Sequence, residues 1–469
     1  MSKPIAASPL RLTAPPAVYR QRRARLAAQL TRPLVLFAGH APARNLPSNA
    51  HPFRAGSSYL YFGGPPLENA ALFIEPGSDG DAGCTLVRPT WGVEDAIWVG
   101  DPLPDEVLVE AAGLERGRLI APDQLPWLLT GHDAAYLAPP APETLALAAR
   151  LELAPASPDE RAAIVNLRLV KDEHELAAMR RAAEVTVAAH RAALAAAVPG
   201  RREADVAAAF HAVLVAHECQ PSFTPIISIR GEIFHGVGHS NLLTEGALLL
   251  IDGGAEEPGG YAGDCTRTVP VGGHWSPIQR HLYDTVRRAN EAATAAAVPG
   301  ARWRHVHELA ARVICEGLIA AELLRGDPAE LAARNAHALF FPHGLGHLIG
   351  LDVHDMRDFG DVAGYPPGRS RPTEFGTKFL RFDRDLEPGL TATVEPGIYF
   401  NPAIWSCDEL VQPLADVVDR RRVDALLRDR FGGIRIEHTI CVRAAGGPEI
   451  LTAGLPTDAD QLTMLLGNT

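Results

Sequence analysis

The chain has 469 residues, of which 47% are apolar and 21% are charged, as in an ordinary globular protein, so a disordered or fibrous chain is excluded. Its 44 basic and 56 acidic residues give a net charge of −12, which argues against broad electrostatic binding to nucleic acid or to an anionic membrane. No stretch approaches the ~18 consecutive apolar residues of a membrane helix, and the start of the chain has no apolar secretory core, so we expect a cytoplasmic protein.

The six cysteines lie far apart and include no C-x-x-C pair. This spacing indicates neither a disulfide framework nor a thiolate zinc site, and we expect reduced, mostly buried thiols. The cysteines are Cys84, Cys219, Cys265, Cys315, Cys407 and Cys441.

The first third of the chain mixes short apolar strand candidates, at residues 33–37 and 70–74, with Gly/Pro turns. A proline-rich run at 137–142 follows. From Ser157 the composition changes to a charged, alanine-rich helical pattern, which a serine and a proline introduce as helix-start signals. We therefore expect one domain over residues 1–160 and a second over residues 161–469.

The second region opens with helices to about residue 218 and continues with strand-and-turn sequence to about residue 273. Two alanine-rich helical stretches extend to about residue 336, and we expect strand and loop from there to the end. Runs of strands separated by runs of helices predict an α+β domain with an antiparallel sheet.

Several acidic residues in this region follow apolar, strand-like runs. Asp252 closes such a run, where a buried and unpaired carboxylate would cost several kcal/mol. Glu395 and Glu437 also follow apolar or alternating runs. Carboxylates that face one point repel each other strongly, whereas two divalent ions would balance their charge. Oxygen-rich ligands with one imidazole favour Mn²⁺, although Co²⁺ or Zn²⁺ would fit.

Each of these segments alone has a simpler explanation. A lone Asp before Gly-Gly is usually a turn residue, and a lone Glu-Pro-Gly is more often a loop. Arg435 and Glu437 alone would form a solvated strand face, and the two histidines of HGLGH would be ordinary loop histidines. Only their joint occurrence in one order favours a metal centre.

That order resembles the M24 metallopeptidases of the creatinase or "pita-bread" fold over residues 160 to 450. The motifs IDGG, GDCTRT, HGLGHLIGLDVHD, VEPGIYF and GGIRIEHT carry the resemblance. It implies a pita-bread catalytic domain with an antiparallel sheet. It also implies that two metal ions are bound, with Asp264 and Glu437 spanning both, by Asp252, Asp264, His347, Glu395 and Glu437.

The first domain adds a second resemblance, to the smaller α/β N-terminal domain of aminopeptidase P and prolidase. The segments FRAGSSYLYFG at 53–63 and EDAIWVG at 94–100 carry it. It implies the proline-specific branch, acting on short proline-containing peptides as a homodimer or higher homo-oligomer. The segments 364–366 and 378–389 look more like prolidases, so we lean to Xaa-Pro dipeptides, with an aminopeptidase P for longer peptides as the alternative.

Two departures from the family pattern touch no proposed metal ligand. The segment 229–236 replaces the usual stretch ending in His-Tyr, and leaves His235 as the substrate-side histidine. His438 stands where an acid commonly follows the last glutamate.

The expected chemistry suits a bond before proline, which is a tertiary amide without an N–H. Two ions would activate water and polarise the scissile carbonyl. We assign proton transfer to Glu395 and donation to the carbonyl oxygen to His354 and His235. Arg435 shares a strand face with Glu437 and is expected to hold carboxylates or substrate.

Three residues are assigned to substrate binding. Arg381 would fork onto the free carboxylate of a dipeptide, and a surface salt bridge is its alternative. Trp98 matches a tryptophan that reaches the neighbouring subunit's active-site mouth in prolidase-like dimers, and a buried core position is its alternative. His343 is the third.

Two other classes of function remain as alternatives. One is a non-catalytic pita-bread module that binds peptides or chromatin, and the other is creatinase-like C–N hydrolysis. Such relatives lack a complete two-metal ligand set, whereas all five ligands are present here.

Overall fold

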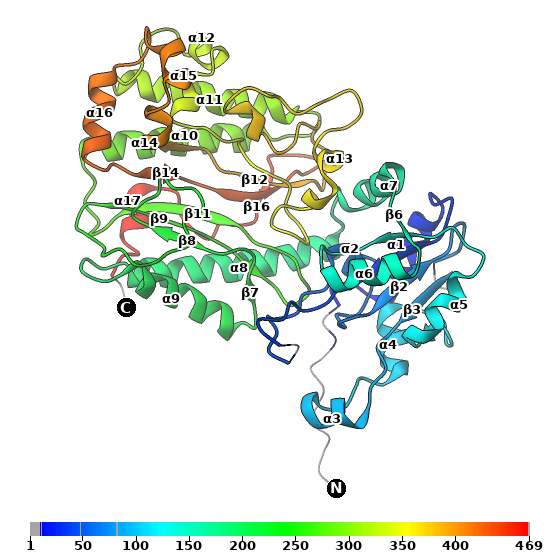
Figure 1. Ribbon diagram of the computed structural model, residues 1–469. Coiled ribbons are helices and arrows are strands. Elements are labelled where there is room, and N and C mark those ends of the chain that lie inside the picture. Colours follow the sequence, from blue (N-terminus) through cyan, green and yellow to red (C-terminus); the bar gives the residue numbers. More distant parts are fainter. Residues whose placement is uncertain (1–9, 11, 47, 81–82, 468–469) are drawn as a thin grey trace. The chain divides into compact units, whose positions relative to one another are not determined.

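The computed structural model describes residues 10, 12–46, 48–80 and 83–467, and the chain forms two compact units, Met1–Leu169 and Val170–Thr469 (Figure 1). The expected boundary near residue 160 lies inside helix α7 (Pro158–Arg168). This helix begins where the serine and proline predict. Ser157 Oγ accepts from the backbone N–H of Glu160, and the Glu160 carboxylate accepts in return from the N–H of Ser157.

The first unit is built on a six-stranded mixed sheet in the order β4-β3-β2-β1-β5-β6. Its central strands are fully buried, which explains their unbroken apolar sequences, and β1 and β2 confirm the two strand predictions. The strands are β1 (Leu34–Phe37), β2 (Ala71–Ile74), β3 (Cys84–Val87), β4 (Leu119–Ile120), β5 (Ala135–Leu137) and β6 (Ala154–Pro155). Its other helices are α1 (Pro16–Ala27), α2 (Ser57–Tyr61), α3 (Val93–Val99), α4 (Asp105–Ala112), α5 (Leu125–Leu129) and α6 (Pro142–Arg150).

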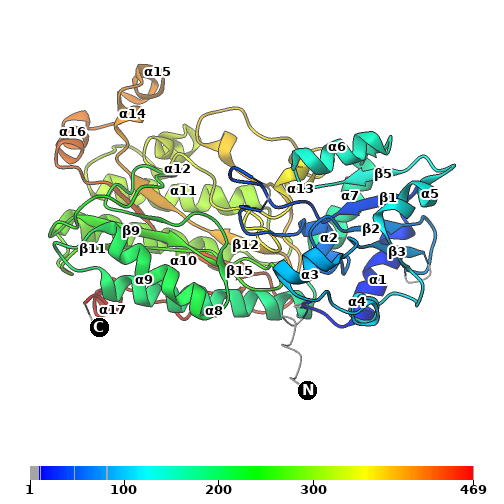
Figure 2. The ribbon, with the colours of Figure 1, turned by 60° about the horizontal axis from the view of Figure 1, so that its bottom comes forward.

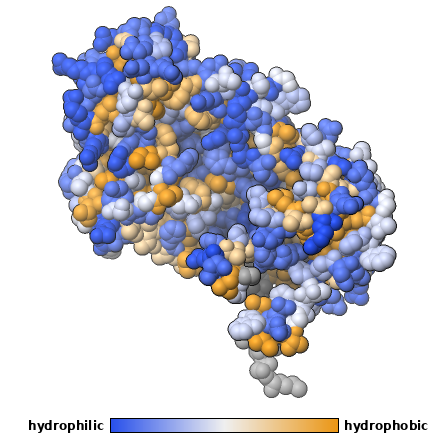
Figure 3. All heavy atoms as spheres, in the orientation of Figure 1, coloured by the Kyte–Doolittle hydropathy of each residue, from blue (hydrophilic) through white to orange (hydrophobic). Residues whose placement is uncertain are grey.

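Helix α3 differs from the other helices of the first unit because none of its residues is buried. Val93, Ile97, Trp98 and Val99 are all exposed, and Figure 3 shows apolar residues on the surface at this place. Trp98 is 83% exposed, so the alternative of a buried core tryptophan is wrong.

The second unit places antiparallel strands between two sets of helices. The strands are β7 (Gln220–Pro221), β8 (Ile226–Ser228), β9 (Leu248–Gly253), β10 (Ala255–Glu256), β11 (Cys265–Pro270), β12 (Thr391–Val394), β13 (Gly397–Tyr399), β14 (Gly433–Arg435), β15 (His438–Cys441) and β16 (Glu449–Ile450). The main helices are α8 (Glu173–Ala196), α9 (Glu203–Ala216), α10 (Pro277–Ala296), α11 (Trp303–Ala320) and α12 (Pro328–Ala333).

Helices α8 and α9 cover one side of these strands, and α10 and α11 cover the other (Figures 1 and 2). Helix α8 contacts β9, and α10 contacts β12 to β14. The strands pair antiparallel throughout, in the orders β11-β9-β8, β12-β15-β16, β13-β14 and β10-β7. This arrangement is the predicted α+β pita-bread domain.

The prediction of strand and loop after residue 336 is wrong in part. Five short α-helices lie there: α13 (Asp361–Gly364), α14 (Pro402–Trp405), α15 (Asp408–Val411), α16 (Arg420–Arg428) and α17 (Ala459–Thr463). The side chains of Asn401, Asp419 and Asp458 cap the N-termini of α14, α16 and α17. Helices of four to nine residues show too few turns for apolar periodicity to reveal them.

The cysteines in the structure are free thiols, and all but Cys407 are buried. None of the helices in the described part of the chain combines the length and the apolarity that crossing a bilayer requires.

Candidate metal centre and active site

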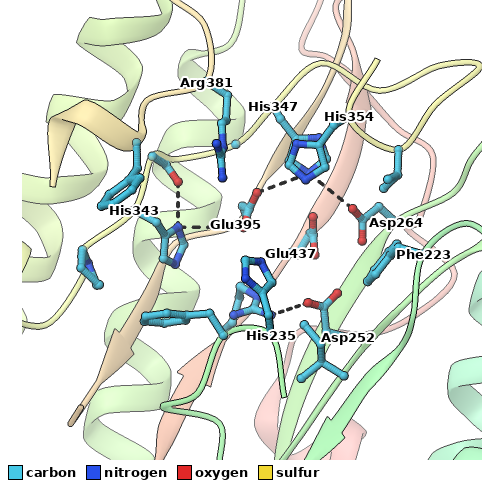
Figure 4. A pocket seen from close by; sticks show the side chains of 18 of the residues that line it. Phe223, His235, Asp252, Asp264, His343, His347, His354, Arg381, Glu395 and Glu437 are labelled. Carbon is cyan, nitrogen blue, oxygen red and sulfur yellow. Dashed lines mark hydrogen bonds and ion pairs between the residues drawn. The ribbon is translucent and has the colours of Figure 1, made fainter. Parts of the chain in front are cut away.

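One cavity of about 650 Å³ in the second unit brings the predicted chemistry together. All five predicted metal ligands line it, and so do the other site residues predicted in this unit (Figure 4). These residues are Asp252, Asp264, His347, Glu395 and Glu437, with His235, His343, His354, Arg381 and Arg435.

Two neighbouring strand pairs supply the four acidic residues of this predicted set. Asp252 lies in β9 and Asp264 directly precedes β11, and these two strands pair antiparallel with Asp252 opposite Thr266. Glu395 follows β12, and Glu437 lies between β14 and β15. Because each acid sits at or next to the end of a buried strand, its carboxylate is held on rigid backbone.

The register of the second strand pair sets the two glutamates opposite each other. Val394 pairs with His438 in β12 and β15, and Gly397 pairs with Arg435 in β13 and β14. The same register runs through both pairs. Residues 395–396 and 436–437 lie in the interval, outside any strand. Glu395 and Glu437 therefore face one another where the ladder is interrupted.

The imidazole of His347 completes the group of predicted ligands. Its Nε2 lies 3.4 Å from Asp264 Oδ2 and 3.6 Å from Glu395 Oε1, while its Nδ1 lies 3.1 Å from the carbonyl oxygen of Leu348. A carbonyl only accepts, so Nδ1 carries the proton of the neutral ring and Nε2 presents its lone pair. Ligand atoms of Asp264, His347 and Glu437 all lie within 4.8 Å of one another.

The charge of this group fits cations. Four carboxylates share the cavity with two guanidinium groups, those of Arg435 and Arg381, which leaves a formal net charge of −2. Burial above all, and then repulsion between the carboxylates, raises the pKa of Glu437 well above its usual range. The pKa of Asp264 is raised and that of Glu395 is raised to about 7, with burial as the largest cause in both. Two divalent ions would bring the missing positive charge, so the residues fit the ions that the resemblance implies.

Two threonines that sequence reasoning missed orient the glutamates. Thr266 Oγ1 donates to Glu437 Oε2 at 2.6 Å, and Thr393 Oγ1 donates to Glu395 Oε1 at 3.2 Å. Thr393 Oγ1 also accepts from the N–H of His347 at 3.0 Å. Thr393 stands two residues before Glu395, on the same face of the strand, and this spacing is the signal that could have identified it.

Arg435 is buried and spends its donors on protein groups. Its Nη2 donates to Asp252 Oδ2, its Nε to Thr266 Oγ1 at 3.1 Å and its Nη1 to the hydroxyl of Tyr399 at 2.9 Å. Tyr399 was also missed by sequence reasoning. It stands two residues beyond Gly397, the residue that pairs with Arg435, and this same-face spacing was its signal.

His354 and His343 lie on either side of the ligand group. The ring of His354 stacks on that of His347 with the centroids 3.8 Å apart, and the charge that His347 carries when it is protonated, followed by burial, lowers the pKa of His354 to about 2. His343 Nε2 lies 2.9 Å from the hydroxyl of Tyr399, and burial lowers its pKa to about 3. Both rings are neutral. The Nδ1–H of His343 donates to the carbonyl oxygen of Gly344 at 2.8 Å, so its Nε2 accepts from the hydroxyl of Tyr399, while the one N–H of His354 can donate.

Arg381 and His235 border the open part of the cavity. In the described part of the chain, no carboxylate lies within ion-pair distance of Arg381, so the alternative of a surface salt bridge is wrong. His235 lies in the segment between β8 and β9 and is exposed at the cavity wall.

Apolar side chains make up much of the remaining wall, and sequence reasoning did not identify them. Phe234 stacks edge-on against Tyr399 and His343. The other large apolar lining residues are Phe223, Ile226, Val237, Val353, Phe375, Phe379 and Ile404.

Comparison with known families agrees with this geometry. Residues 177–444 match metallopeptidase family M24, and residues 19–134 match the aminopeptidase P N-terminal domain.

Individual relatives match over nearly the whole chain. The Xaa-Pro aminopeptidase of Escherichia coli (strain K12) is 32% identical over 450 residues, which cover 92% of this chain and 93% of that protein. Proline aminopeptidase P II from Yersinia pestis is 28% identical with a TM-score of 0.80, over 97% of this chain and 100% of that one. Zinc-substituted E. coli aminopeptidase P in complex with product is 29% identical with a TM-score of 0.77, over 97% and 98% of the two chains. The chain therefore belongs to metallopeptidase family M24, whose members work with divalent metal ions.

Proposed function

We propose that this protein is an Xaa-Pro aminopeptidase, which removes the N-terminal residue ahead of proline from peptides. The observation that carries the proposal is the convergence of four carboxylates and the Nε2 of His347 on one wall of a peptide-sized cavity. The names of the relatives support a substrate longer than a dipeptide. They favour the second of the two substrate hypotheses over the dipeptide preference.

The proposed ligands of the ions are Asp252, Asp264, His347, Glu395 and Glu437. Bound divalent ions would supply a Lewis acid and an activated water next to the scissile bond. Mn²⁺ is the proposed resident ion, because four of the five ligands are carboxylates. One of the relatives is described as zinc-substituted, so Zn²⁺ belongs in the same experiment.

The surrounding side chains have distinct proposed roles. Glu395 lies between His343 and His347, where its carboxylate can pass a proton to the proline nitrogen as the bond breaks. His354 and His235 are the proposed donors to the carbonyl oxygen, and His343 contacts the substrate. Arg435 acts through Asp252 and Tyr399, so its proposed role is to position them.

A dipeptidase activity is the second candidate, and one observation favours it. The guanidinium of Arg381 lines the cavity and has no carboxylate partner in the described part of the chain. The free carboxylate of an Xaa-Pro dipeptide would supply that partner.

We also propose that the protein forms a homo-oligomer through the first unit. The exposed apolar residues of α3, with Trp98 at their centre, are an unusual surface for an isolated subunit. Sedimentation velocity of the wild type and of Trp98→Asp tests this proposal. A smaller species in the variant supports it, and a monomeric wild type contradicts it.

The deciding experiment measures hydrolysis by metal-stripped protein before and after Mn²⁺, Co²⁺ or Zn²⁺ is added. The substrates are Xaa-Pro-Yaa-Zaa, Xaa-Pro and, as a control for proline, Xaa-Ala-Yaa-Zaa. We expect metal-dependent release of Xaa from the first substrate and little from the third. Turnover of the dipeptide alone would decide for the second candidate. Activity that survives complete removal of metal would contradict both.

A further inference from the structure

The backbone ladder that carries Glu395 and Glu437 has a missing donor. At the interruption between the two strand pairs, the N–H of Ile436 donates to the carbonyl oxygen of Pro396 at 3.4 Å. The return bond cannot form, because proline has no N–H. The carbonyl oxygen of Ile436 is thus left without a donor from the opposite strand, in a buried position where an unsatisfied carbonyl is costly.

Asn290 of helix α10 supplies the missing donor. Its side-chain Nδ2 donates to the carbonyl oxygen of Ile436 at 3.1 Å and to that of Val394 at 2.7 Å. An amide NH₂ has two hydrogens, so both bonds form at once, and two acceptors fix the orientation of the amide. Asn290 is 2% exposed, which removes competition from water.

The two acceptors are the peptides directly before the two glutamates. One side chain of α10 therefore ties both strands together at the level of the interruption. The N–H groups of the glutamates themselves are held elsewhere, that of Glu395 by the carbonyl of Leu345 at 2.8 Å and that of Glu437 by the carbonyl of Thr266 at 3.1 Å. The bonds of Asn290 are thus the side-chain link between the backbone segments that present these carboxylates.

We propose that Asn290 is a positioning residue for the metal centre, which replaces the N–H that Pro396 lacks and so sets the spacing of Glu395 and Glu437. The inference rests on the proposed metal ligands. Asn290 touches neither substrate nor metal and acts only through the two backbone carbonyls. Its effect is therefore expected first on metal affinity, because groups that orient metal ligands tune how tightly the ion is held.

The test is the binding of Mn²⁺ to metal-stripped wild type and to Asn290→Leu, measured by titration calorimetry. Leucine has a similar size and no donor. We expect Mn²⁺ binding to weaken about ten-fold or more, the lower end of the range for residues that orient metal ligands. Asn290→Ser, which keeps a single donor, is the milder variant for the case in which the leucine variant fails to fold, and weaker Mn²⁺ binding is expected there too.

Thr294→Val is the matched control. Thr294 lies one turn further along α10, is 7% exposed, and its hydroxyl has no hydrogen-bond partner in the described part of the chain. Its replacement should leave Mn²⁺ affinity unchanged. Equal weakening in this control would overturn the inference, because the effect would then come from the packing of the helix.

A double-mutant cycle separates the specific role from a general structural one. Pro396→Ala returns an N–H to the ladder, so Asn290→Leu should cost less Mn²⁺ affinity in that background than in the wild type. An equal cost in both backgrounds would overturn the inference. Mn²⁺ binding of wild-type strength by Asn290→Leu would overturn this inference and leave the proposed function standing. Failure of the wild type to bind any divalent ion would overturn the proposed function and this inference with it.

Discussion

Arg381 gives the sharpest test of whether the protein recognises a free carboxylate directly after the proline of its substrate. Its guanidinium lines the active-site cavity without a carboxylate partner in the described part of the chain (Figure 4). Replacing it by alanine therefore breaks no internal ion pair, and the unfolding midpoint should stay close to that of the wild type. Any large effect should appear in catalysis.

The size of that effect depends on the substrate. The loss of a charge-assisted hydrogen bond costs about 1.5–3 kcal/mol. At ~1.4 kcal/mol per decade, Arg381→Ala should lower kcat/KM for Xaa-Pro by about ten- to a hundred-fold. The proline of Xaa-Pro-Yaa-Zaa carries a peptide bond instead of a carboxylate at this point, so its kcat/KM should change much less. The assay is initial-rate hydrolysis of both substrates by Mn²⁺-loaded enzyme.

Lys378→Ala is the control for this experiment. Lys378 is a cation of the same segment, but it is exposed and does not line the cavity. Its removal should leave both substrates unaffected. An equal loss on the two substrates in Arg381→Ala would refute the reasoning, because Arg381 would then support the structure of the site and not the recognition of a carboxylate.

Three further predictions concern the metal centre and the stability of the second unit. Asp264→Asn removes one of four carboxylates, so metal content and turnover should both collapse; normal metal by elemental analysis would contradict the assignment. His354→Ala should lower kcat by about 10²-fold with normal metal content, as loss of an oxyanion donor does; loss of metal would place His354 among the ligands. Burial lowers the pKa of His307 to about 4 and that of His337 to about 3. In the unfolded chain these histidines have pKa values near ~6.5, so below that pH the unfolded chain binds protons that the folded chain does not bind. The contribution of the neutral histidines to the free energy of unfolding is therefore fully present above pH ~6.5. It is lost as the pH drops toward 4, by about 3 kcal/mol for His307. Urea unfolding at pH 7.5 and pH 5 should show the loss, and His307→Phe with His337→Phe should reduce it. An identical pH dependence in that variant would count against the assignment.

Much of the site follows from local sequence alone. Asp252 ends an apolar run that reads as a buried strand, and a carboxylate in that position requires positive charge nearby. Glu395 and Glu437 follow strands in the same way. The start of α7 is predicted by the serine, proline and glutamate of its capping box. These features depend on neighbours within a few residues, so their physical causes are visible without a structure.

The short helices from residue 402 onward and the exposure of Trp98 could not be predicted from local sequence. Four-residue helices such as α14 depend on a cap and on packing that involves distant residues. A large apolar residue such as Trp98 could be buried in the core or exposed, and the sequence does not distinguish the two. Only the structure shows that no described part of the chain covers it.

The sequence by itself determined which acidic residues follow apolar, strand-like runs, because side-chain alternation and burial are local properties, and its resemblance to a family implied the five proposed ligands. The tertiary structure alone decided which strands are neighbours. It set Glu395 opposite Glu437, joined Arg435 to Asp252, and left Arg381 at the cavity without a carboxylate partner among the described residues. It also brought Asn290 from a distant helix to two backbone carbonyls. Pairing between segments a hundred residues apart depends on the whole fold, since period-two alternation specifies the face of a strand but not its partner.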